Sequence, residues 1–400
     1  MKILFLSRWF PYPSDNGSKI RIYHLIKALS KAHSVDLVSF CGDALTPEQE
    51  KKMLSLCYTV DTVIYQPFNP TRLKGIIGFF SRQPRFLIDT YNQKMASIID
   101  RKAKTADYDA IIVSEIDMTP YVCGVNGPAK IFEEMEISKA LDSLHTGHYR
   151  WNNWRNSLTW WKLASYLNSL ALTFDGFTTA SQKELQHVEK IPALQGKVRI
   201  IPNGMEILAQ IDRPGISPKR GTLIYAGSLT YQANFDAVDY FLHEIFPLIQ
   251  QKYPGVKFYI TGKLDEVDLT RLPRSEDVIF TGYLPDVARA ITESWVSVIP
   301  LRIGGGTRLK ILESLGLGTP VVSTSKGAEG LDLEPGCDIL IGDDAQAFAD
   351  QVVKVLEDEG LRWRLGQAGR QSVAQKYNWN DIEADFCSYV ETIVSRHAVH

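Results

Sequence analysis

The most informative stretch of the chain is residues 298–331, which read VIPLRIGGGTRLKILESLGLGTPVVSTSKGAEGL. The apolar residues 296–300, which overlap the start of this stretch, predict a short buried strand, and residues 320–324 predict a second one. Between them, three consecutive glycines predict a turn in which the backbone can approach a ligand closely. Thr307 is then expected to cap a helix that runs to about Leu317. The stretch therefore predicts a strand, a glycine turn, a helix and a further strand.

This turn and helix combine the features of a binding site for a phosphate or diphosphate. The start of a helix offers unpaired N–H groups and the positive end of the helix dipole. Gly305, Gly306 and Thr307 are expected to supply such N–H groups. Arg308 and Lys310 add two positive charges at the same end. The pattern therefore predicts an anion site built from both backbone and side chains.

Glu313 follows Lys310 by three residues on the predicted helix, and Gly306 precedes Lys310 by four. These spacings place the three residues on one helix face. A carboxylate about one turn beyond a diphosphate-binding cation would suit the diol of a ribose. The alternative is that Lys310 and Glu313 form an ordinary surface pair, worth roughly 0.2–0.5 kcal/mol, beside a tight glycine turn.

The segment resembles the nucleotide-sugar-binding core of the retaining glycosyltransferases of family 4, which have two facing Rossmann-like domains (the GT-B fold). Many members read E-x7-E across this turn and helix, and their second glutamate binds the ribose of the donor. Glu313 matches that second glutamate, whereas Gly305 stands at the place of the first. The chain is thus similar to the subgroup whose loop reads GGGTRLKILE. In this subgroup Arg308 and Lys310 are expected to neutralise the diphosphate.

Residues 223–239 resemble the first β-turn-α unit of the donor domain in this family, with Gly227 in the turn. Many members carry an arginine after this glycine and a lysine five residues further on. Here Ser228 and Ala233 stand at those places, so both usual cations are missing. The resemblance therefore implies that Gly227 and Ser228 contact the donor while the cations of the glycine turn carry more of the charge neutralisation.

Two further segments resemble the family at lower specificity. Residues 198–206 (VRIIPNGME) are similar to the strand and turn that open the donor domain. Residues 280–286 (FTGYLPD) match a loop that often lies near the nucleotide base, which makes Tyr283 a candidate donor contact. The resemblance covers most of residues 198–385 and the first forty residues, and it is vague between about 45 and 195.

Length and composition set limits without naming a function. Four hundred residues predict two domains, and 44% hydrophobic residues suffice for two buried cores. A net charge of −2 argues against a general nucleic-acid binder. The five cysteines show no zinc-site spacing and are expected to be reduced thiols. The apolar N-terminal run is too short for a secretory signal, so a cytoplasmic location is expected.

Strands and helices alternate along the chain, which predicts an α/β protein with parallel sheets covered by helices. In the first half, the strand candidates are residues 2–7, 35–40, 60–65, 110–114, 130–134 and 176–180, with a helix at 18–32 among those between them. We expect an acceptor-side domain at 1–195, a donor-binding domain at 196–375 and a helix at 376–400 that returns to the first domain. Ligands of such folds lie at the carboxyl ends of the strands.

The first domain carries a second glycine turn directly after its first strand. Gly17 and Ser18 open a helix there, so their N–H groups are candidates to face the donor or the acceptor. The equal alternative is that residues 15–17 form only a capped β-α turn. Arg21, one turn into the helix, points either to the cleft or to solvent, and the resemblance favours the cleft.

Residues 132–138 (FEEMEIS) end a predicted strand where relatives often place polar residues near the reacting sugar carbon. Glu134 and Glu136 are therefore candidates to orient the acceptor hydroxyl. The alternative is a solvated loop, which is the commoner setting for three glutamates at a strand end. His145 and His148 lie nearby, but their spacing lacks the further ligands that a zinc site needs.

The region from 150 to 174 is unusually aromatic and basic, with four tryptophans (Trp151, Trp154, Trp160 and Trp161). Such a helix can lie on an anionic membrane surface or receive a lipid-linked acceptor, so the chain is compatible with peripheral contact at the inner face of a membrane. Because its charges are not segregated to one face, a buried helix of the first domain is the favoured alternative.

The resemblance implies a glycosyltransferase that retains anomeric configuration. Its donor would be a UDP- or GDP-linked sugar, and its acceptor a saccharide or a lipid-linked intermediate of a bacterial polysaccharide or glycoconjugate. Arg308 and Lys310 would stabilise the departing diphosphate electrostatically, with Glu134 and Glu136 on the acceptor side. The D-x-D sequence at 107–109 directly precedes a strand, so no essential metal and no cofactor are expected.

Two other functions stay open on the sequence alone. A nucleotide-sugar epimerase of the same fold would use the same donor site without an acceptor. A noncatalytic partner protein that binds a sugar nucleotide would account for the missing glutamate and the two missing cations.

Overall fold

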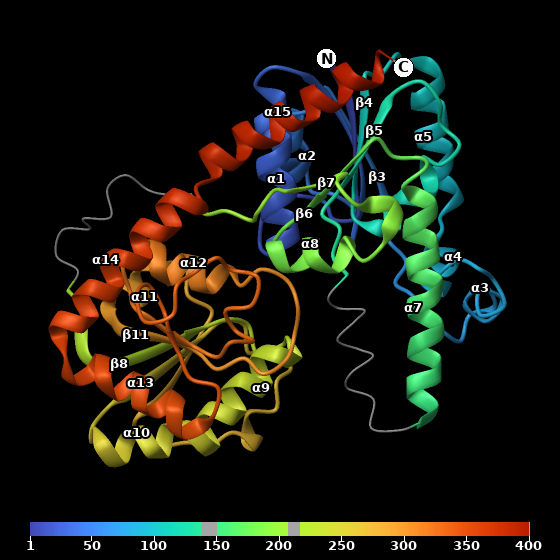
Figure 1. The fold of residues 1–400 in the computed structure, drawn as a ribbon. Helices are drawn as coiled ribbons and strands as arrows, with labels where there is room; N and C mark the ends of the chain where they lie inside the picture. Colours follow the sequence, from blue (N-terminus) through green and yellow to red (C-terminus); the bar gives the residue numbers. More distant parts are fainter. Residues whose placement is uncertain (138–149, 207–216, 400) are drawn as a thin grey trace. The chain divides into compact units, whose positions relative to one another are not determined.

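The computed structural model describes residues 1–137, 150–206 and 217–399 (Figure 1). The chain divides into two compact units, each with its own sheet and core. Unit 1 comprises Met1–Asn203 and Asn380–His400, and unit 2 comprises Gly204–Trp379. The sequence placed these divisions at 195/196 and 375/376, whereas the compact units change at 203/204 and 379/380.

Unit 1 is built on a seven-stranded parallel sheet in the order β3-β2-β1-β4-β5-β6-β7. The strands are Lys2–Ser7 (β1), Ser34–Cys41 (β2), Thr59–Ile64 (β3), Ala110–Ser114 (β4), Ala129–Glu133 (β5), Gly176–Thr179 (β6) and Val198–Ile200 (β7). The first six confirm the predicted strands within one residue at each end. The seventh corrects the assignment of residues 198–206 to the second domain, because β7 pairs in parallel with β6.

Helices cover both faces of this sheet, with α1 and α2 on one side and α5 on the other (Figure 1). The helices are Gly17–Ser30 (α1), Pro47–Leu54 (α2), Leu73–Ile77 (α3), Arg85–Thr90 (α4), Gln93–Thr105 (α5), Arg150–Leu170 (α7) and Gln182–Val188 (α8), with 3₁₀ turns at Ile116–Tyr121 (η1) and Pro192–Leu194 (η2). The central strands β1, β4 and β5 are buried on both faces, which explains why they read as continuous apolar runs rather than as alternating ones.

The last helix, α15 (Trp379–His397), packs onto unit 1 through polar as well as apolar contacts. Glu383 accepts a hydrogen bond from the Nζ of Lys31 at 2.7 Å, and its other oxygen lies 2.9 Å from Nδ1 of His24. Tyr389 binds the backbone of Phe177 in β6, both as acceptor at 2.9 Å and as donor at 3.0 Å. The final helix is therefore tied to α1 and to the sheet.

Unit 2 contains a six-stranded parallel sheet in the order β10-β9-β8-β11-β12-β13. The strands are Lys219–Ala226 (β8), Lys257–Thr261 (β9), Val278–Gly282 (β10), Ser294–Ile299 (β11), Val321–Ser323 (β12) and Leu340–Ile341 (β13). The helices are Gln232–Tyr240 (α9), Phe246–Lys252 (α10), Val287–Glu293 (α11), Leu309–Gly316 (α12), Ala345–Glu357 (α13) and Glu359–Lys376 (α14), with a π-turn at Phe241–Ile245 (η3) and a 3₁₀ turn at Leu269–Arg271 (η4).

Successive residues of β8 show how the two faces of this sheet are covered. Leu223 and Tyr225 point into a core shared with α9, α10 and α13, whereas Ile224 and Ala226 pack on the opposite face against Ile291 of α11. The predicted α/β alternation with parallel sheets is thus confirmed in both units.

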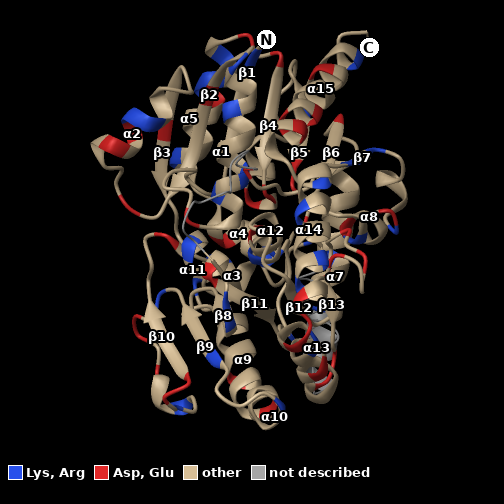
Figure 2. Cartoon of the chain, turned by 90° about the vertical axis from the view of Figure 1, so that its left-hand side faces the viewer, with Lys and Arg blue, Asp and Glu red and all other residues tan. Residues whose placement is uncertain are grey.

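Charged residues of both signs are interspersed over both units, as Figure 2 shows from one side. None of the helices in the described part of the chain combines the length and the apolar composition that crossing a membrane requires.

Candidate functional site

The glycine turn of unit 2 lies at the carboxyl ends of the neighbouring strands β8 and β11. From these two strands the strand order continues toward opposite edges of the sheet. The strand order runs outward from β8 to β10 in one direction and from β11 to β13 in the other. This topological switch point is the usual ligand-binding position of open parallel sheets. The carboxyl end of β8 carries Gly227, and that of β11 leads into residues 300–308.

The backbone of the glycine turn has the predicted character. Gly304 and Gly306 have φ values of 103° and 80°, in the left-handed region that disfavours other residues. A Cβ on Gly304 would also lie 3.3 Å from the Cβ of Ala233. The turn therefore requires glycine for its own conformation and for its close approach to α9.

The helix after the turn begins later than the sequence predicted. Arg308, not Thr307, is the N-cap, and α12 starts at Leu309. Gly306 therefore lies outside the helix, and the predicted common face reduces to Lys310 and Glu313. The shift arises because the left-handed Gly306 holds the following residues in the turn, where Leu309 N–H donates to the carbonyl of Thr307 at 3.1 Å.

Lys310 extends from α12 to residues of the first β-turn-α unit. Its Nζ donates hydrogen bonds to the hydroxyl of Tyr225 at 2.9 Å and to Oδ1 of Asn234 at 2.8 Å. It also lies 4.2 Å from the centroid of the Tyr225 ring. Burial, with a smaller effect from the charge of Arg308, lowers the pKa of Lys310 to about 7. Lys310 is therefore a held, partly buried cation rather than half of an ordinary surface pair.

Gly227 has a distinct reason for being glycine. A Cβ built on it would lie 2.5 Å from Nζ of Lys310 and 3.0 Å from Nδ2 of Asn234. The absence of a side chain thus makes room for the lysine that reaches across from α12. The amide of Asn234 completes the arrangement by donating to the carbonyl of Ser228 at 2.7 Å.

Arg308 is buried, with 8% of its surface exposed, and its guanidinium donates to the carbonyl of Gly305. Its side chain therefore holds the glycine turn. At the same time, its charge lies close enough to Lys310 to lower the pKa of that lysine.

Glu313 lies one turn after Lys310 on α12 and is partly buried. Burial raises the pKa of its carboxyl, and the neighbouring positive charge of Lys310 opposes that rise. In the part of the chain that the structure describes, no side chain or backbone N–H donates to this carboxylate at hydrogen-bond distance. Its oxygens are thus available to hydroxyl groups of a ligand.

The two remaining donor candidates differ in their surroundings. Ser228 lies beside Gly227, and its hydroxyl is 2.7 Å from that of Thr230. Tyr283 follows β10 and is 69% exposed. The ends of β8, β9 and β10 adjoin, because Gly227 N–H donates to Thr261 and Gly262 N–H donates to Gly282. Both residues therefore lie along the same edge of the sheet.

Unit 1 has a cavity of about 380 Å³ at its own strand ends. Polar groups from three elements line it, namely Ser18 at the start of α1, Glu115 after β4, and Glu134 and Glu136 after β5. Trp9, two residues after β1, forms part of the wall, and the rest is mostly apolar. Since the strand order of this sheet reverses between β1 and β4, the cavity also lies near a topological switch point.

Two glutamates of this cavity have strained backbone conformations, and the carboxylates that line it are only partly solvated. Glu115 and Glu134 have φ values of 69° and 57°, which are costly for residues other than glycine and often mark functional positions. Burial, together with the negative charges of Glu133, Glu115 and Glu136, raises the pKa of Glu134 to about 8, although the positive charge of Arg21 opposes the shift. The solvated-loop alternative for these glutamates is therefore wrong.

Arg21 does not point to solvent, so that alternative is wrong. Its side chain is fully buried, and its Nε donates to Oε1 of Glu133 at 2.5 Å. Its Nη1 donates to Asn203 at 3.1 Å, and Ser114 donates to the other oxygen of Glu133 at 2.8 Å. The Arg21–Glu133 pair is fully buried, with Nε of Arg21 3.8 Å from Oε2 of Glu134, and an unpaired charge would be costly there.

The glycine turn of unit 1 agrees with both interpretations of its sequence. Asn16 caps α1 by accepting from Lys19 N–H at 3.0 Å, as a plain β-α turn would require. Gly17 begins the helix, and Ser18 lines the cavity.

The aromatic region forms helix α7, whose Leu163, Tyr166 and Leu167 belong to the core of unit 1. Trp161 is 57% exposed, and Trp160 packs against the core. The side chains of Trp151 and Trp154, and residues His145 and His148, lie outside the described residues.

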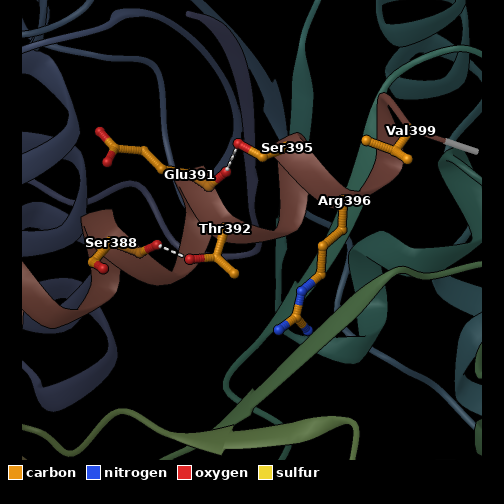
Figure 3. Close-up of a pocket in the computed structure, with 6 residues that line it drawn as sticks. All are labelled: Ser388, Glu391, Thr392, Ser395, Arg396 and Val399. Carbon is orange, nitrogen blue, oxygen red and sulfur yellow. Dashed lines mark hydrogen bonds between the residues drawn. The ribbon is translucent and has the colours of Figure 1, made fainter.

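A shallow surface pocket on α15 is not a candidate site. Its lining residues, labelled in Figure 3, all come from one helix or its end, and their hydroxyls bind backbone carbonyls one turn away, as Thr392 does with Ser388 and Ser395 with Glu391. It therefore gathers no groups from separate elements.

Sequence reasoning missed Tyr225 and Asn234, which hold Lys310. Tyr225 reads as one more residue of a buried strand, and Asn234 as one polar residue of a helix. Only the parallel pairing of β8 with β11 brings them next to α12. Glu115 was also missed, because it stands as a lone acid after β4.

Comparison with known proteins gives two family matches. Residues 15–207 match the family described as Glycosyltransferase Family 4, and residues 220–358 match the family described as Glycosyl transferases group 1. A "Uncharacterized 44.6 kDa protein in cps region" of Klebsiella pneumoniae is 20% identical, and the match covers 88% of this chain and 90% of that protein.

Two relatives with described activities match over shorter ranges. The phosphatidyl-myo-inositol mannosyltransferase of Mycobacterium leprae is 26% identical over 49% of this chain and 54% of its own length. The capsular polysaccharide biosynthesis glycosyltransferase CapM of Staphylococcus aureus is 26% identical over 38% of this chain and 43% of its own length. The chain thus spans about half the length of these two enzymes.

Solved structures share the fold over nearly the whole chain. Sucrose-phosphate synthase from Thermosynechococcus elongatus superposes with a TM-score of 0.70 at 15% identity, covering 99% of this chain and 100% of that one. Anabaena Alr3699/HepE in complex with UDP-glucose gives a TM-score of 0.65 at 14% identity, covering 98% and 100%. The two parallel-sheet units thus form the GT-B fold, and each half of the chain is similar to a glycosyltransferase family.

Proposed function

We propose that this chain is a retaining glycosyltransferase that moves a sugar from a nucleotide diphosphate sugar to an acceptor hydroxyl in the synthesis of a polysaccharide or glycolipid. The observation that carries the proposal is Lys310, held at the switch point of unit 2 beside the side-chain-free Gly227, with Glu313 one turn further on. The names of the Staphylococcus and Mycobacterium relatives support the product class.

The donor would bind along the strand ends of unit 2. The N–H groups of Gly305, Gly306 and Thr307 and the ammonium of Lys310 would face the diphosphate, while Arg308 holds the turn and adds positive charge. Glu313 would accept hydrogen bonds from the ribose diol, because its carboxylate accepts none from the described residues.

Two further residues would complete the donor site. Ser228 would contact the phosphates from the turn after β8. Tyr283, largely exposed after β10, would lie against the base. The HepE complex, which contains UDP-glucose, supports a uridine nucleotide as the first donor to test.

The acceptor would use the cavity of unit 1. Carboxylates bind sugar hydroxyls well, and the face of Trp9 suits the apolar face of a sugar ring. Because the pKa of Glu134 is raised to about 8, this carboxyl can keep its proton at neutral pH and donate it in a hydrogen bond. Glu136 and Ser18 would orient the same hydroxyl group. An epimerase would need no such second site, which favours transfer.

In the reaction, the bond from the anomeric carbon to the diphosphate breaks and the diphosphate leaves with the electron pair. The acceptor oxygen forms the new bond to the same carbon, and its proton passes to the oxygen of the leaving diphosphate. Lys310 and the turn N–H groups would stabilise the charge on the leaving diphosphate, so we propose that no metal ion is needed. Full activity in the presence of EDTA is the expected result, and loss of activity that Mg²⁺ restores would contradict it.

The central experiment is calorimetric binding of UDP-, GDP- and ADP-sugars to the wild-type chain and to Glu313→Ala. We expect one base to be selected, and the variant to bind that sugar nucleotide at least tenfold more weakly, since a ribose hydrogen bond to a charged group is worth roughly 1.5–3 kcal/mol. Equal affinity in the variant would exclude the ribose role of Glu313.

Hydrolysis of the selected donor distinguishes the remaining functions. NMR spectroscopy should first detect the free sugar with the anomeric configuration of the donor, as retention requires. Release of an epimerised sugar nucleotide would instead establish an epimerase. If the donor binds but is neither hydrolysed nor transferred to any saccharide or lipid-linked acceptor, a noncatalytic partner protein would be favoured.

A further inference from the structure

Unit 1 presents a row of apolar side chains that belongs to neither candidate site. Leu73, Ile76, Ile77 and Phe80, on α3 and the turn after it, are 73%, 49%, 57% and 86% exposed. Leu73, Ile76 and Ile77 are spaced by three and four residues, which places them on one face of α3, and Phe80 lies in the turn that follows. Single exposed apolar residues are ordinary, but a contiguous row marks an interaction surface. We call these four residues the α3 apolar row.

The segment that carries the row is held firmly from behind by basic side chains. Arg85 donates to the carbonyl of Gly75 at 2.9 Å and to that of Pro70 at 3.0 Å. Lys162 of α7 is buried and donates to the carbonyl of Phe79 at 2.6 Å. The apolar row therefore faces outward from a built turn rather than from a frayed one.

The segment that carries the row contains only positive charge. Residues 68–88 contain four basic residues (Arg72, Lys74, Arg82 and Arg85) and no acidic one, although the whole chain has a net charge of −2. Lys74 and Arg82 are exposed. The next carboxylate, Asp89, is buried and lies 3.2 Å from Arg72. Lys74 donates to the carbonyl of Tyr91 at 3.3 Å and so keeps its positive charge without an acidic partner. An exposed apolar row flanked by such positive charge matches an anionic, partly apolar surface.

We propose that the α3 apolar row inserts into the surface of an anionic lipid bilayer, with Lys74 and Arg82 at the level of the headgroups. Apolar side chains at the interface combined with basic residues are the features of monotopic membrane binding. A protein partner fits less well, because a stable protein interface takes roughly 20–30 residues a side and is depleted in lysine. This places membrane contact on α3, whereas the sequence had suggested the aromatic helix α7.

The inference is tested by sedimentation with vesicles of phosphatidylcholine alone and of phosphatidylcholine mixed with phosphatidylglycerol. The proteins are the wild-type chain, Ile77→Ser/Phe80→Ser, Lys74→Gln/Arg82→Gln and the control Leu172→Ser, which removes a side chain that is 88% exposed elsewhere in unit 1. Circular dichroism and thermal unfolding show whether each variant has kept its fold.

The wild-type chain should bind the anionic vesicles and release them at high salt. Ile77→Ser/Phe80→Ser should weaken binding by roughly tenfold or more. Lys74→Gln/Arg82→Gln should weaken it by about fivefold for each charge removed and flatten the salt dependence. Leu172→Ser should behave as wild type.

Three results would overturn the proposal. These are no binding of the wild-type chain to anionic vesicles, equal binding by both double variants, or a dimer in lipid-free solution that Ile77→Ser/Phe80→Ser dissociates. Lys74→Gln/Arg82→Gln changes only exposed charges, so it keeps the test decisive if the apolar double variant fails to fold.

Discussion

Lys310 shows how a single side chain can join segments that lie far apart in sequence. It leaves α12 and reaches Tyr225 and Asn234, 85 and 76 residues earlier. The family usually places its cations within the first β-turn-α unit, where this chain has Ser228 and Ala233. Here a cation from the neighbouring strand-helix unit occupies that space, and Gly227 leaves the room for it.

Gly227→Ala tests this use of space. The added methyl would lie 2.5 Å from Nζ of Lys310, so the lysine must move while the backbone is little strained. We expect sugar-nucleotide affinity to fall about tenfold, with a change in the free energy of unfolding within about 1 kcal/mol. Calorimetry and thermal unfolding measure the two effects. Gly124→Ala, where the methyl meets nothing within 4 Å, is the matched control.

The pH dependence of donor binding tests the charge of Lys310. Because its pKa is lowered to about 7, the free chain loses this positive charge as the pH rises above 7. A bound diphosphate favours the charged form, so affinity should fall by up to about tenfold per pH unit from pH 7 upward. Lys310→Met should bind more weakly at pH 6.5 and show a flat profile. An unchanged affinity of the wild-type chain from pH 6.5 to 8.5 would contradict the role.

At the scale of elements, the start of α12 depends on local contacts, whereas the sheet that β7 joins depends on contacts distant in sequence. The start of α12 moves to Leu309 because Gly306 adopts a left-handed conformation. The strand β7 joins unit 1 because its residues pair with β6, for example Thr178 with Arg199. Propensity predicted both elements, but it contained no information on which sheet would accept β7.

Helix α15 offers the clearest test of an element's attachment. The hydroxyl of Tyr389 satisfies both the N–H and the carbonyl of Phe177. Tyr389→Phe should leave these buried groups unpaired and lower the stability of unit 1 by roughly 1–3 kcal/mol. Thermal unfolding and hydrogen exchange at Phe177 measure this loss. Tyr58→Phe, at a tyrosine that is 76% exposed, should change neither.

At the scale of the whole molecule, the Glu134 carboxyl in the cavity of unit 1 lowers the free energy of unfolding. Glu134 is held beside Glu133, Glu115 and Glu136, and burial adds to the repulsion, so its pKa rises from an ordinary 4.5 to about 8. Between these values the folded chain holds a proton that the unfolded chain releases. The free energy of unfolding should therefore fall as the pH rises from about 5 to 8.

Glu134→Gln, which imitates the protonated carboxyl, measures this contribution. Its unfolding free energy should exceed that of the wild-type chain by at least about 1 kcal/mol at pH 8, and the difference should shrink toward pH 5. Denaturant unfolding at a series of pH values gives the comparison. Parallel curves for the two proteins would refute the assignment, and Glu50→Gln, at an exposed glutamate, should follow wild type.

The sequence by itself determined the strands, the glycine turn and the α/β class of both units. Apolar runs of strand length predict buried strands, and glycines such as Gly304 and Gly306 are favoured where φ is positive. It also pointed to Lys310 and Glu313, because three-residue spacing is a property of the helix alone.

Only the tertiary structure decided what those residues touch. Tyr225 and Asn234 meet Lys310 because β8 lies next to β11, an order that no local pattern encodes. Similarly, Arg21 became a buried partner of Glu133, and Glu115 joined Glu134 at one cavity. The physical reason is that strand order sets which chain segments become neighbours, and neighbours set burial, charge and pKa.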